Sequence, residues 1–387
     1  MIPYGRQQIL PEDIKQVVDV LTSDFITQGP KVPAFEKAIA NYCQATYAFA
    51  VNSATSALHI ATLALDIKSG DIVWTSPISF VASANCALYC GASVDFVDIN
   101  RKTVNICPKE LQNKLILAKK NKQLPKVLIV VHMAGLSCDM QRIHQLAQEY
   151  NFKIIEDASH AIGGEYQGKK IGNCQYSDMV VFSFHPVKII TTAEGGMVLT
   201  NNHQYAQKLA QLRSHGITKD PEQLTANKEQ AWYYEQQSLG FNFRMTELQA
   251  ALGLSQLPRL DVFIEQRQAL AKNYLQALKG LPLSFQQQNE QSKSSYHLFL
   301  IQLTDESPID RTTLFNQLRK ANIGVNVHYI PIHTQPYYQE IGFNEGDFPQ
   351  AESYYEQCLS LPLYPDLSKE DFKHIVSTLT DLLSDRK

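Results

Sequence analysis

The fold is most constrained by short apolar runs that alternate with amphipathic stretches over residues 48–200. The runs have the length of strands, and they are Ala48–Val51, Ile72–Thr75, Val94–Val97, Val127–Val131, Lys153–Ile155, Val180–Phe184 and Gly196–Thr200. Helical patterns lie between them, at Ser53–Leu65, Phe80–Tyr89, Pro108–Lys120 and Met140–Tyr150. Continuous apolar strands separated by helices predict a mainly parallel sheet that helices cover on both faces.

The pattern changes after about residue 255. Pro258–Leu278 predicts one long helix, and the polar stretch Gln286–Ser295 predicts an exposed loop. Further strands are expected at Tyr296–Leu303 and Gly324–His328, and further helices at Thr312–Ala321 and Lys369–Leu383. We therefore expect an α/β architecture in which residues 1–255 form a large domain and residues 256–387 form a smaller α+β domain.

Composition excludes several classes of protein. Hydrophobic residues make up 44% of the 387 and charged residues 19%, which predicts a large buried core. A net charge of −3 gives no support for nucleic-acid or anionic-membrane partners. The N-terminus lacks a secretory pattern, and no apolar stretch has membrane-spanning length. The seven cysteines show neither disulfide-framework nor zinc-site spacing, so we expect reduced thiols, a cytoplasmic location and no metal site.

Two segments at expected strand ends indicate cofactor chemistry, one with Asp157 and the other with Lys188. Asp157 ends one apolar strand, and Ser183 stands at the end of another and opens Ser183-Phe-His-Pro-Val-Lys188. In parallel sheets the C-terminal ends of the strands face the ligand crevice, so these segments should lie close together. A lysine that can form a Schiff base and an acid that can keep a pyridine nitrogen protonated are what pyridoxal 5'-phosphate (PLP) chemistry needs.

Other residues could complete such a site. Asn52–Ser56 opens a helix whose N-terminus could attract a phosphate, Phe80 could stack on a ring, and His160 could pack against it. Each also has an ordinary structural reading: a helix N-cap, a core aromatic and a satisfied histidine. Asp157 and Ser183 could equally cap turns, and Lys188 on its own could be a solvated lysine.

Taken together, these segments resemble the DegT/StrS-type family of PLP-dependent aminotransferases, which act on nucleotide-linked keto-sugars. The resemblance implies an aspartate aminotransferase-like fold (PLP fold type I). The matching segments occur in order over nearly the whole chain: Thr27–Pro30, Asn52–Ser56, Asp157 with His160, Ser183–Lys188, Glu194–Gly196, Arg213–Gly216 and Asn242–Met245.

The resemblance implies roles for individual residues. Lys188 would bind the cofactor aldehyde covalently and then move a proton, and Asp157 would pair with the pyridine nitrogen. Asn242 would reach the phosphate from the second subunit of a homodimer, whose active sites would then be shared. The other implied cofactor contacts are Ala54, Thr55 and Ser183 at the phosphate and Phe80 and His160 at the ring.

The implied substrates are L-glutamate and a UDP-linked 4-keto-6-deoxy-N-acetylhexosamine, used in ping-pong order at one site. Ser183–Gly196 and Val327-His328-Tyr329 resemble the subgroup that forms UDP-4-amino-4,6-dideoxy-N-acetyl-β-L-altrosamine for pseudaminic acid. Residues that would line the sugar-nucleotide site are Tyr4, Asp24, Phe25, Ile26, Thr27, Val327, His328, Tyr329 and Ile330. Arg213 and Arg244 are candidates for binding the carboxylate of glutamate.

Alternative functions remain open from the sequence. An aminotransferase for a related keto-sugar of different configuration would share all these motifs. A PLP-dependent sugar dehydratase of the same fold would have histidine in place of Lys188. A cysteine desulfurase would have a histidine directly before the lysine, where this chain has Val187. A ligand sensor that keeps the fold would need neither Lys188 nor Asp157.

Overall fold

A computed structural model describes residues 1–226 and 230–384. Its centre is a seven-stranded sheet of order β1-β11-β10-β7-β6-β2-β3. The strands are β1 (Tyr47–Val51), β11 (Gly196–Thr200), β10 (Met179–Ser183), β7 (Lys153–Asp157), β6 (Val127–Val131), β2 (Ile72–Thr75) and β3 (Ser93–Phe96). The predicted strands and the mainly parallel sheet are confirmed, and β7 extends two residues further than expected, so that Asp157 is its last residue.

One strand departs from the expected direction. β11 runs antiparallel to both β1 and β10, whereas the other strands of this sheet run the same way. The connection from β10 to β11 contains no described helix, and without a crossover the chain can only return in the opposite direction. The reversal places Ser183, at the end of β10, opposite Gly196, at the start of β11.

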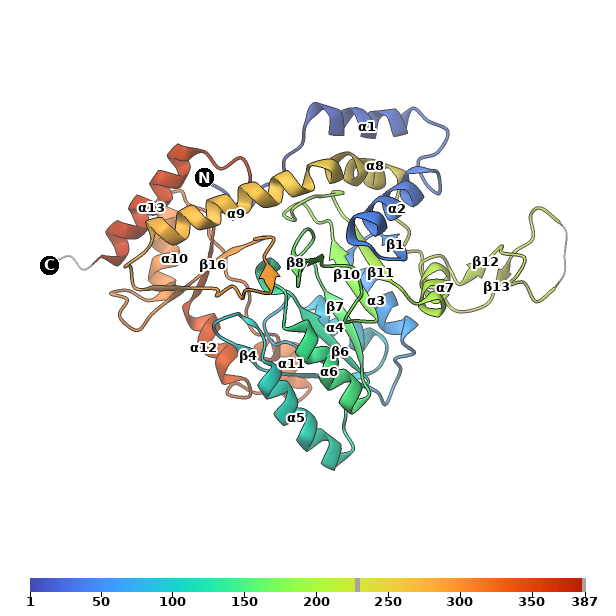
Figure 1. The fold of residues 1–387 in the computed structure, drawn as a ribbon, viewed down its shortest axis with the longest axis horizontal. Coiled ribbons are helices and arrows are strands. Elements are labelled where there is room, and N and C mark those ends of the chain that lie inside the picture. The colour runs from blue at the N-terminus through green and yellow to red at the C-terminus, as the bar shows by residue number, and fades with distance from the viewer. Residues whose placement is uncertain (227–229, 385–387) are drawn as a thin grey trace.

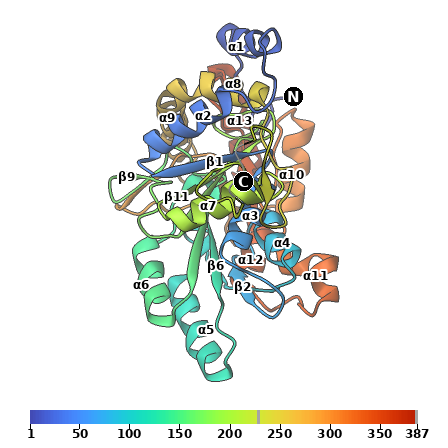
Figure 2. The same cartoon turned by 90° about the vertical axis from the view of Figure 1, so that its right-hand side faces the viewer.

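Helices cover both faces of the sheet (Figure 2). The first face carries α3 (Ala54–Ala64), α4 (Ala82–Tyr89) and α7 (His203–Leu212). The second face carries α2 (Lys31–Cys43), α8 (Glu247–Gln256), α5 (Pro108–Asn121) and α6 (Met140–Tyr150). Neighbouring residues of one strand therefore enter different cores: Ile155 packs with α3 and α4, and Ile154 with α5 and α6. This double burial explains why the strands are apolar throughout.

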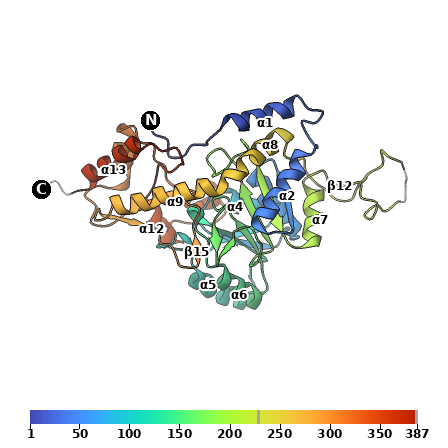
Figure 3. The same cartoon turned by 45° about the horizontal axis from the view of Figure 1, so that its top comes forward.

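The helix α9 (Leu260–Ala277) extends from α8 across the molecule towards α13 (Lys369–Leu383), as Figures 1 and 3 show. With α10 (Arg311–Lys320) it packs against a second sheet of order β14-β16-β17. The strands of that sheet are β14 (Leu283–Phe285), β16 (Phe299–Leu303) and β17 (Cys358–Leu361).

One prediction in this part of the chain was wrong, and another was only partly correct. Gly324–His328 forms no strand; it makes only a single bridge, between Asn326 and Ser360. Gln286–Ser295 is not simply an exposed loop, because its end is buried at Ser294 and Ser295 and β15 (Ser292–Lys293) pairs with β8 (Glu165–Tyr166). In both stretches the pairing partners, Ser360 and β8, are distant in the sequence, so the local residue pattern could not predict them.

The remaining elements are short or peripheral. The helices are α1 (Pro11–Leu21), α11 (Pro336–Glu340), α12 (Pro349–Gln357) and the 3-10 turns Met133–Gly135, Leu257–Arg259 and Ile332–Thr334. The strands are β4 (Ile99–Asn100), β5 (Asn105–Ile106), β9 (Lys169–Lys170), β12 (Ile217–Thr218) and β13 (Glu235–Gln236). The pair β12–β13 projects from the body of the molecule (Figure 1).

The N-terminal residues lie against the C-terminal part of the chain. Ile2 bridges to Ile323, and the carbonyl of Tyr4 accepts a hydrogen bond of 3.0 Å from the Leu363 N–H. Tyr4 is thereby held beside a segment more than 300 residues away in the sequence. The division into domains 1–255 and 256–387 stays a prediction.

Candidate functional site

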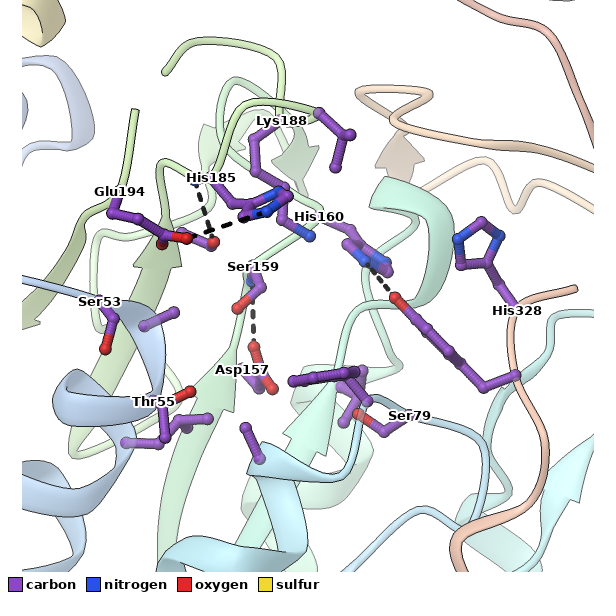
Figure 4. Close-up of a pocket in the computed structure, with 18 of the residues that line it drawn as sticks. Ser53, Thr55, Ser79, Asp157, Ser159, His160, His185, Lys188, Glu194 and His328 are labelled. Atoms are coloured by element: carbon purple, nitrogen blue, oxygen red, sulfur yellow. Dashed lines mark hydrogen bonds and ion pairs between the residues drawn. The ribbon is translucent and has the colours of Figure 1, made fainter. Parts of the chain in front are cut away.

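A cavity of ≈ 460 Å³ lies at the C-terminal ends of β7 and β10 (Figure 4). Many residues predicted from the sequence meet there, although they come from distant segments. Those that line it are Tyr4, Ala54, Thr55, Phe80, Asp157, His160, Ser183, Lys188, His328 and Tyr329. The expectation that the strand ends bring Asp157 and the Ser183–Lys188 segment together thus agrees with the geometry.

Other predicted site residues lie outside this cavity. Arg213 and Arg244 line a second cavity of ≈ 300 Å³, where Arg213 forms an ion pair with Glu36 and Arg244 donates to Ser214 Oγ at 2.9 Å. Asn242 is exposed on the surface. The residues Asp24, Phe25, Ile26 and Thr27 are also exposed, Val327 is half-buried, and Ile330 is exposed. Binding roles for all of these residues stay predictions.

Several residues of the cavity wall received no individual role from the sequence, although Ser53 and Glu194 lie within motifs that were singled out there. These include Ser53, Ser79, Ser159, His185, Glu194 and Asn326. His185 and Glu194 belong to the same run of sequence as Lys188, so a search of that motif for every polar side chain would have found them. Ser79, Ser159 and Asn326 carry no distinctive local signal.

Asp157 and Lys188 approach the cavity from opposite sides in Figure 4. Asp157 is buried and its carboxylate accepts from Ser83 Oγ at 2.6 Å and from the Ser159 N–H at 3.1 Å. Within the described chain, the amine of Lys188 has no hydrogen-bond partner. Burial lowers the pKa of Lys188 to about 8, against the opposing attraction of Asp157. The site therefore offers an unengaged amine and a firmly held carboxylate.

The N-terminus of α3 opens onto the cavity. Ser53 caps this helix by accepting from the Ser56 N–H at 3.1 Å, and Ala54 and Thr55 line the cavity at the first turn. The start of β11 packs directly on it: a Cβ added to Gly196 would stand 2.5 Å from the Ser53 carbonyl oxygen and 2.6 Å from the Ala54 nitrogen. Glycine is required for this approach, and a helix N-terminus with open N–H groups suits an anion.

The opposite wall holds a histidine in one tautomer. His160 Nδ1 accepts from the Ala134 N–H at 3.3 Å, so its proton is on Nε2, which lies 3.2 Å from the Tyr329 hydroxyl and donates to it. Burial, together with the charge of Lys188, holds the pKa of His160 well below its usual value. Burial and Lys188 likewise lower the pKa of His328 to about 3, and its Nδ1 lies 2.7 Å from Ser360 Oγ.

This donor set fits PLP. An amine, a buried carboxylate and a helix N-terminus occupy different sides of one cavity, and the exposed ring of Phe80 stands at its wall. These are the groups that an aldehyde, a pyridine nitrogen, a phosphate and an aromatic ring would each contact. Over residues 1–226 and 230–384, no cluster of histidine, cysteine and acidic residues could hold a metal, and no helix is long and apolar enough to cross a membrane.

The chain belongs to the DegT/DnrJ/EryC1/StrS aminotransferase family, whose model matches residues 7–380. It is 39% identical to the UDP-4-amino-4,6-dideoxy-N-acetyl-beta-L-altrosamine transaminase of Campylobacter jejuni strain 81-176, over 99% of this chain and 98% of that protein. It is 37% identical to the spore coat polysaccharide biosynthesis protein SpsC of Bacillus subtilis, over 99% and 97%.

Solved structures agree with this assignment. PseC of Helicobacter pylori, an aminotransferase involved in the biosynthesis of pseudoaminic acid, superimposes with a TM-score of 0.90 at 33% identity, covering 99% of both chains. Spr1654 of Streptococcus pneumoniae, solved in a PLP form, gives 0.88 at 28% identity and covers 98% of both chains. The family resemblance and the fold are confirmed, and the chain is an enzyme of the sugar aminotransferase class.

Proposed function

We propose that this enzyme uses PLP to transfer the amino group of L-glutamate to C4 of a UDP-linked 4-keto-6-deoxy-N-acetylhexosamine. The product would be UDP-4-amino-4,6-dideoxy-N-acetyl-β-L-altrosamine, a precursor of pseudaminic acid. The observation that carries the chemistry is the unengaged amine of Lys188 in the same cavity as the buried Asp157. The names and whole-chain similarity of the Campylobacter and Helicobacter relatives support the choice of sugar.

In this proposal, different residues of the cavity contact different parts of the cofactor. Lys188 would bind its aldehyde, Asp157 its pyridine nitrogen, and the first turn of α3 with Ser183 its phosphate. Phe80 and His160 would contact the ring. When bound, PLP supplies an electron sink that makes the C–H bond beside the reacting nitrogen acidic.

Lys188 then has a second role as an acid and base. Once displaced by an incoming amine, its side chain would take the proton from one carbon and return it to another. A pKa of about 8 suits this task, because both protonation states are accessible near neutral pH. Asp157 keeps its position through the bonds from Ser83 and Ser159, and neutral His160 keeps Tyr329 oriented in the cavity wall.

We also propose that the active unit is a homodimer in the cytoplasm. The exposed Asn242 lies outside the cavity of its own chain and would contact the phosphate held by the partner. Replacing Asn242 with Ala should therefore weaken retention of PLP, measured as cofactor lost on dialysis. Unchanged retention would remove Asn242 from the phosphate site.

The proposed cytoplasmic location is supported by the cysteines. All seven are free thiols, which suits a reducing compartment.

The proposed reaction is tested by following the visible band of the PLP-loaded protein through each half-reaction. L-Glutamate should remove the band with release of 2-oxoglutarate, and the UDP-linked 4-keto-sugar should restore it with formation of the 4-amino-sugar. A band that glutamate does not remove would exclude glutamate as the donor. A band that no UDP-keto-sugar restores would exclude the proposed acceptor while leaving the amine chemistry intact.

A second candidate is a C4 aminotransferase for a related nucleotide sugar of different configuration. SpsC, whose name refers to a spore coat polysaccharide, matches as much of the chain as the altrosamine transaminases do and at similar identity. A panel of UDP-linked 4-keto-6-deoxy-hexosamines that differ at C5 distinguishes the two candidates. Restoration of the band by the gluco-configured sugar alone would favour the second candidate.

A further inference from the structure

Several side-chain hydrogen bonds hold the backbone of the turn that joins β10 to β11. Thr191 Oγ1 donates to the Phe184 carbonyl at 2.8 Å and accepts from the Ala193 N–H at 2.9 Å. The carbonyl of Glu194 accepts from Thr192 Oγ1 and from Gln249 Nε2, both at 2.7 Å. Ala193 has a φ of +66°, a conformation that costs free energy for a residue with a Cβ.

This rigid turn carries a side chain that its own bonds do not use. The carboxylate of Glu194 lines the cavity, and its side chain is 62% exposed. In the described chain its nearest partner is His185 Nε2, 4.0 Å away and itself 49% exposed. At this distance and exposure even an ion pair would add little stability. None of the hydrogen bonds that hold the turn uses the carboxylate, so the turn positions the backbone of Glu194 and leaves its side chain available.

Among the residues that line the cavity, the acidic ones are Asp157 and Glu194. Asp157 is engaged by Ser83 and Ser159. The exposed carboxylate of Glu194 is therefore available to accept hydrogen bonds from a molecule that enters the cavity. Its natural partners are neutral donors, such as hydroxyl or amide N–H groups. L-Glutamate, with two carboxylates, and a diphosphate are both anions, which a carboxylate repels.

We propose that Glu194 is a specificity-determining residue that accepts hydrogen bonds from the hexose of the nucleotide-sugar substrate, from its hydroxyl or acetamido N–H groups. This inference rests on the proposed function and assigns a residue to one half of it. Glu194 contributes to the sugar half-reaction and not to the glutamate half-reaction. A ping-pong enzyme allows these two halves to be measured separately on the same protein.

The test is Glu194→Gln, which keeps the shape of the side chain and removes the charge, in the PLP-loaded full-length enzyme. We expect the KM for the UDP-4-keto-sugar to rise about 3- to 10-fold, because the amide oxygen of Gln still accepts a hydrogen bond but one about half as strong as that of a carboxylate. The rate at which L-glutamate removes the visible band should stay unchanged or rise, because L-glutamate is also an anion. UDP alone, used as a competitive inhibitor, should bind unchanged or more tightly, because an anionic group has been removed.

Two further variants complete the test. Glu194→Asp keeps the charge but withdraws it by one methylene, and we expect a KM for the sugar between those of the native enzyme and Glu194→Gln. Glu149→Gln, an exposed position on α6, removes an equal charge away from the cavity and should leave every parameter unchanged. Equal loss in both half-reactions of Glu194→Gln, weaker UDP binding, or an unchanged KM for the sugar would each overturn the assignment.

Failure of the inference is distinguishable from failure of the proposed function. If the native enzyme shows no band that glutamate removes, or no keto-sugar restores it, the proposed function fails and the assignment of Glu194 falls with it. If the native enzyme completes both half-reactions and Glu194→Gln completes them equally well, the assignment of Glu194 alone is wrong.

Discussion

At the scale of single residues, the proposed role of Lys188 makes its protonation state decide when the enzyme can bind PLP. Only the neutral amine attacks an aldehyde, and burial lowers the pKa of Lys188 to about 8 from an ordinary value of 10.5. The protonated form is therefore lost as the pH rises through 8, well before an exposed lysine would lose its proton.

This difference predicts the pH dependence of cofactor capture. In protein stripped of PLP, the rate of capture should rise with pH to a midpoint near 8 and level off by about pH 9. Stopped-flow measurement of the growing visible band gives the profile directly. A rate that keeps rising towards pH 10 and beyond would show that Lys188 behaves as an ordinary, solvated lysine.

The positions of some site residues could be predicted from sequence, where chemistry and strand position coincide. Asp157 and the Ser183–Lys188 segment come together because parallel strands end at one edge of a sheet, a rule that needs no coordinates. The partners that fix these groups could not be predicted. Ser83 donates a hydrogen bond to Asp157, 74 residues away in the sequence, and Glu36 forms an ion pair with Arg213, 177 residues away. Only the folded chain shows that these side chains have such partners.

At the scale of elements, the site depends on the close contact of β11 with the start of α3. We predict that Gly196→Ala weakens PLP binding and lowers the free energy of unfolding by about 1–3 kcal/mol, the cost of forcing a methyl group into packed backbone. Both effects follow from pushing Ser53 and Ala54 away from Gly196. PLP titration and urea unfolding measure them.

The matched control is Gly5→Ala, whose added Cβ would meet only Val187 Cβ at an ordinary 4.0 Å. It should leave PLP affinity and unfolding close to native. Native-like behaviour of Gly196→Ala would mean that the turn and helix can separate without cost, and the phosphate-binding region would then have to lie elsewhere.

Most elements of the large sheet were predictable, because strands buried on both faces have an unambiguous apolar pattern. The reversed β11 and the absent strand at Gly324–His328 were not. The apolar residues of the latter stretch contribute to packing, while His328 and Tyr329 face the cavity. A loop that lines a cavity and a strand can share one local pattern, and pairing with a distant strand decides between them.

At the scale of the whole molecule, the proposal of shared active sites predicts subunit complementation. Lys188→Ala and Asn242→Ala should each reduce activity strongly. After joint unfolding and refolding of equal amounts, half of the dimers would combine the two variants, and each of those would contain one intact site. Activity should then recover to about one quarter of native, as random pairing of two-fold dimers requires. No recovery, with native enzyme recovering after the same treatment, would place Lys188 and Asn242 in the same subunit's site.

The central claim, that Lys188 carries the cofactor, is tested most directly by reduction with borohydride. The PLP-loaded enzyme is reduced, digested and examined by mass spectrometry for the lysine that bears a pyridoxyl group. We predict that the label lies on Lys188, and that prior treatment with excess L-glutamate prevents labelling because the amine has been released. A label on a different lysine, or none on a protein that retains the visible band, would contradict the account.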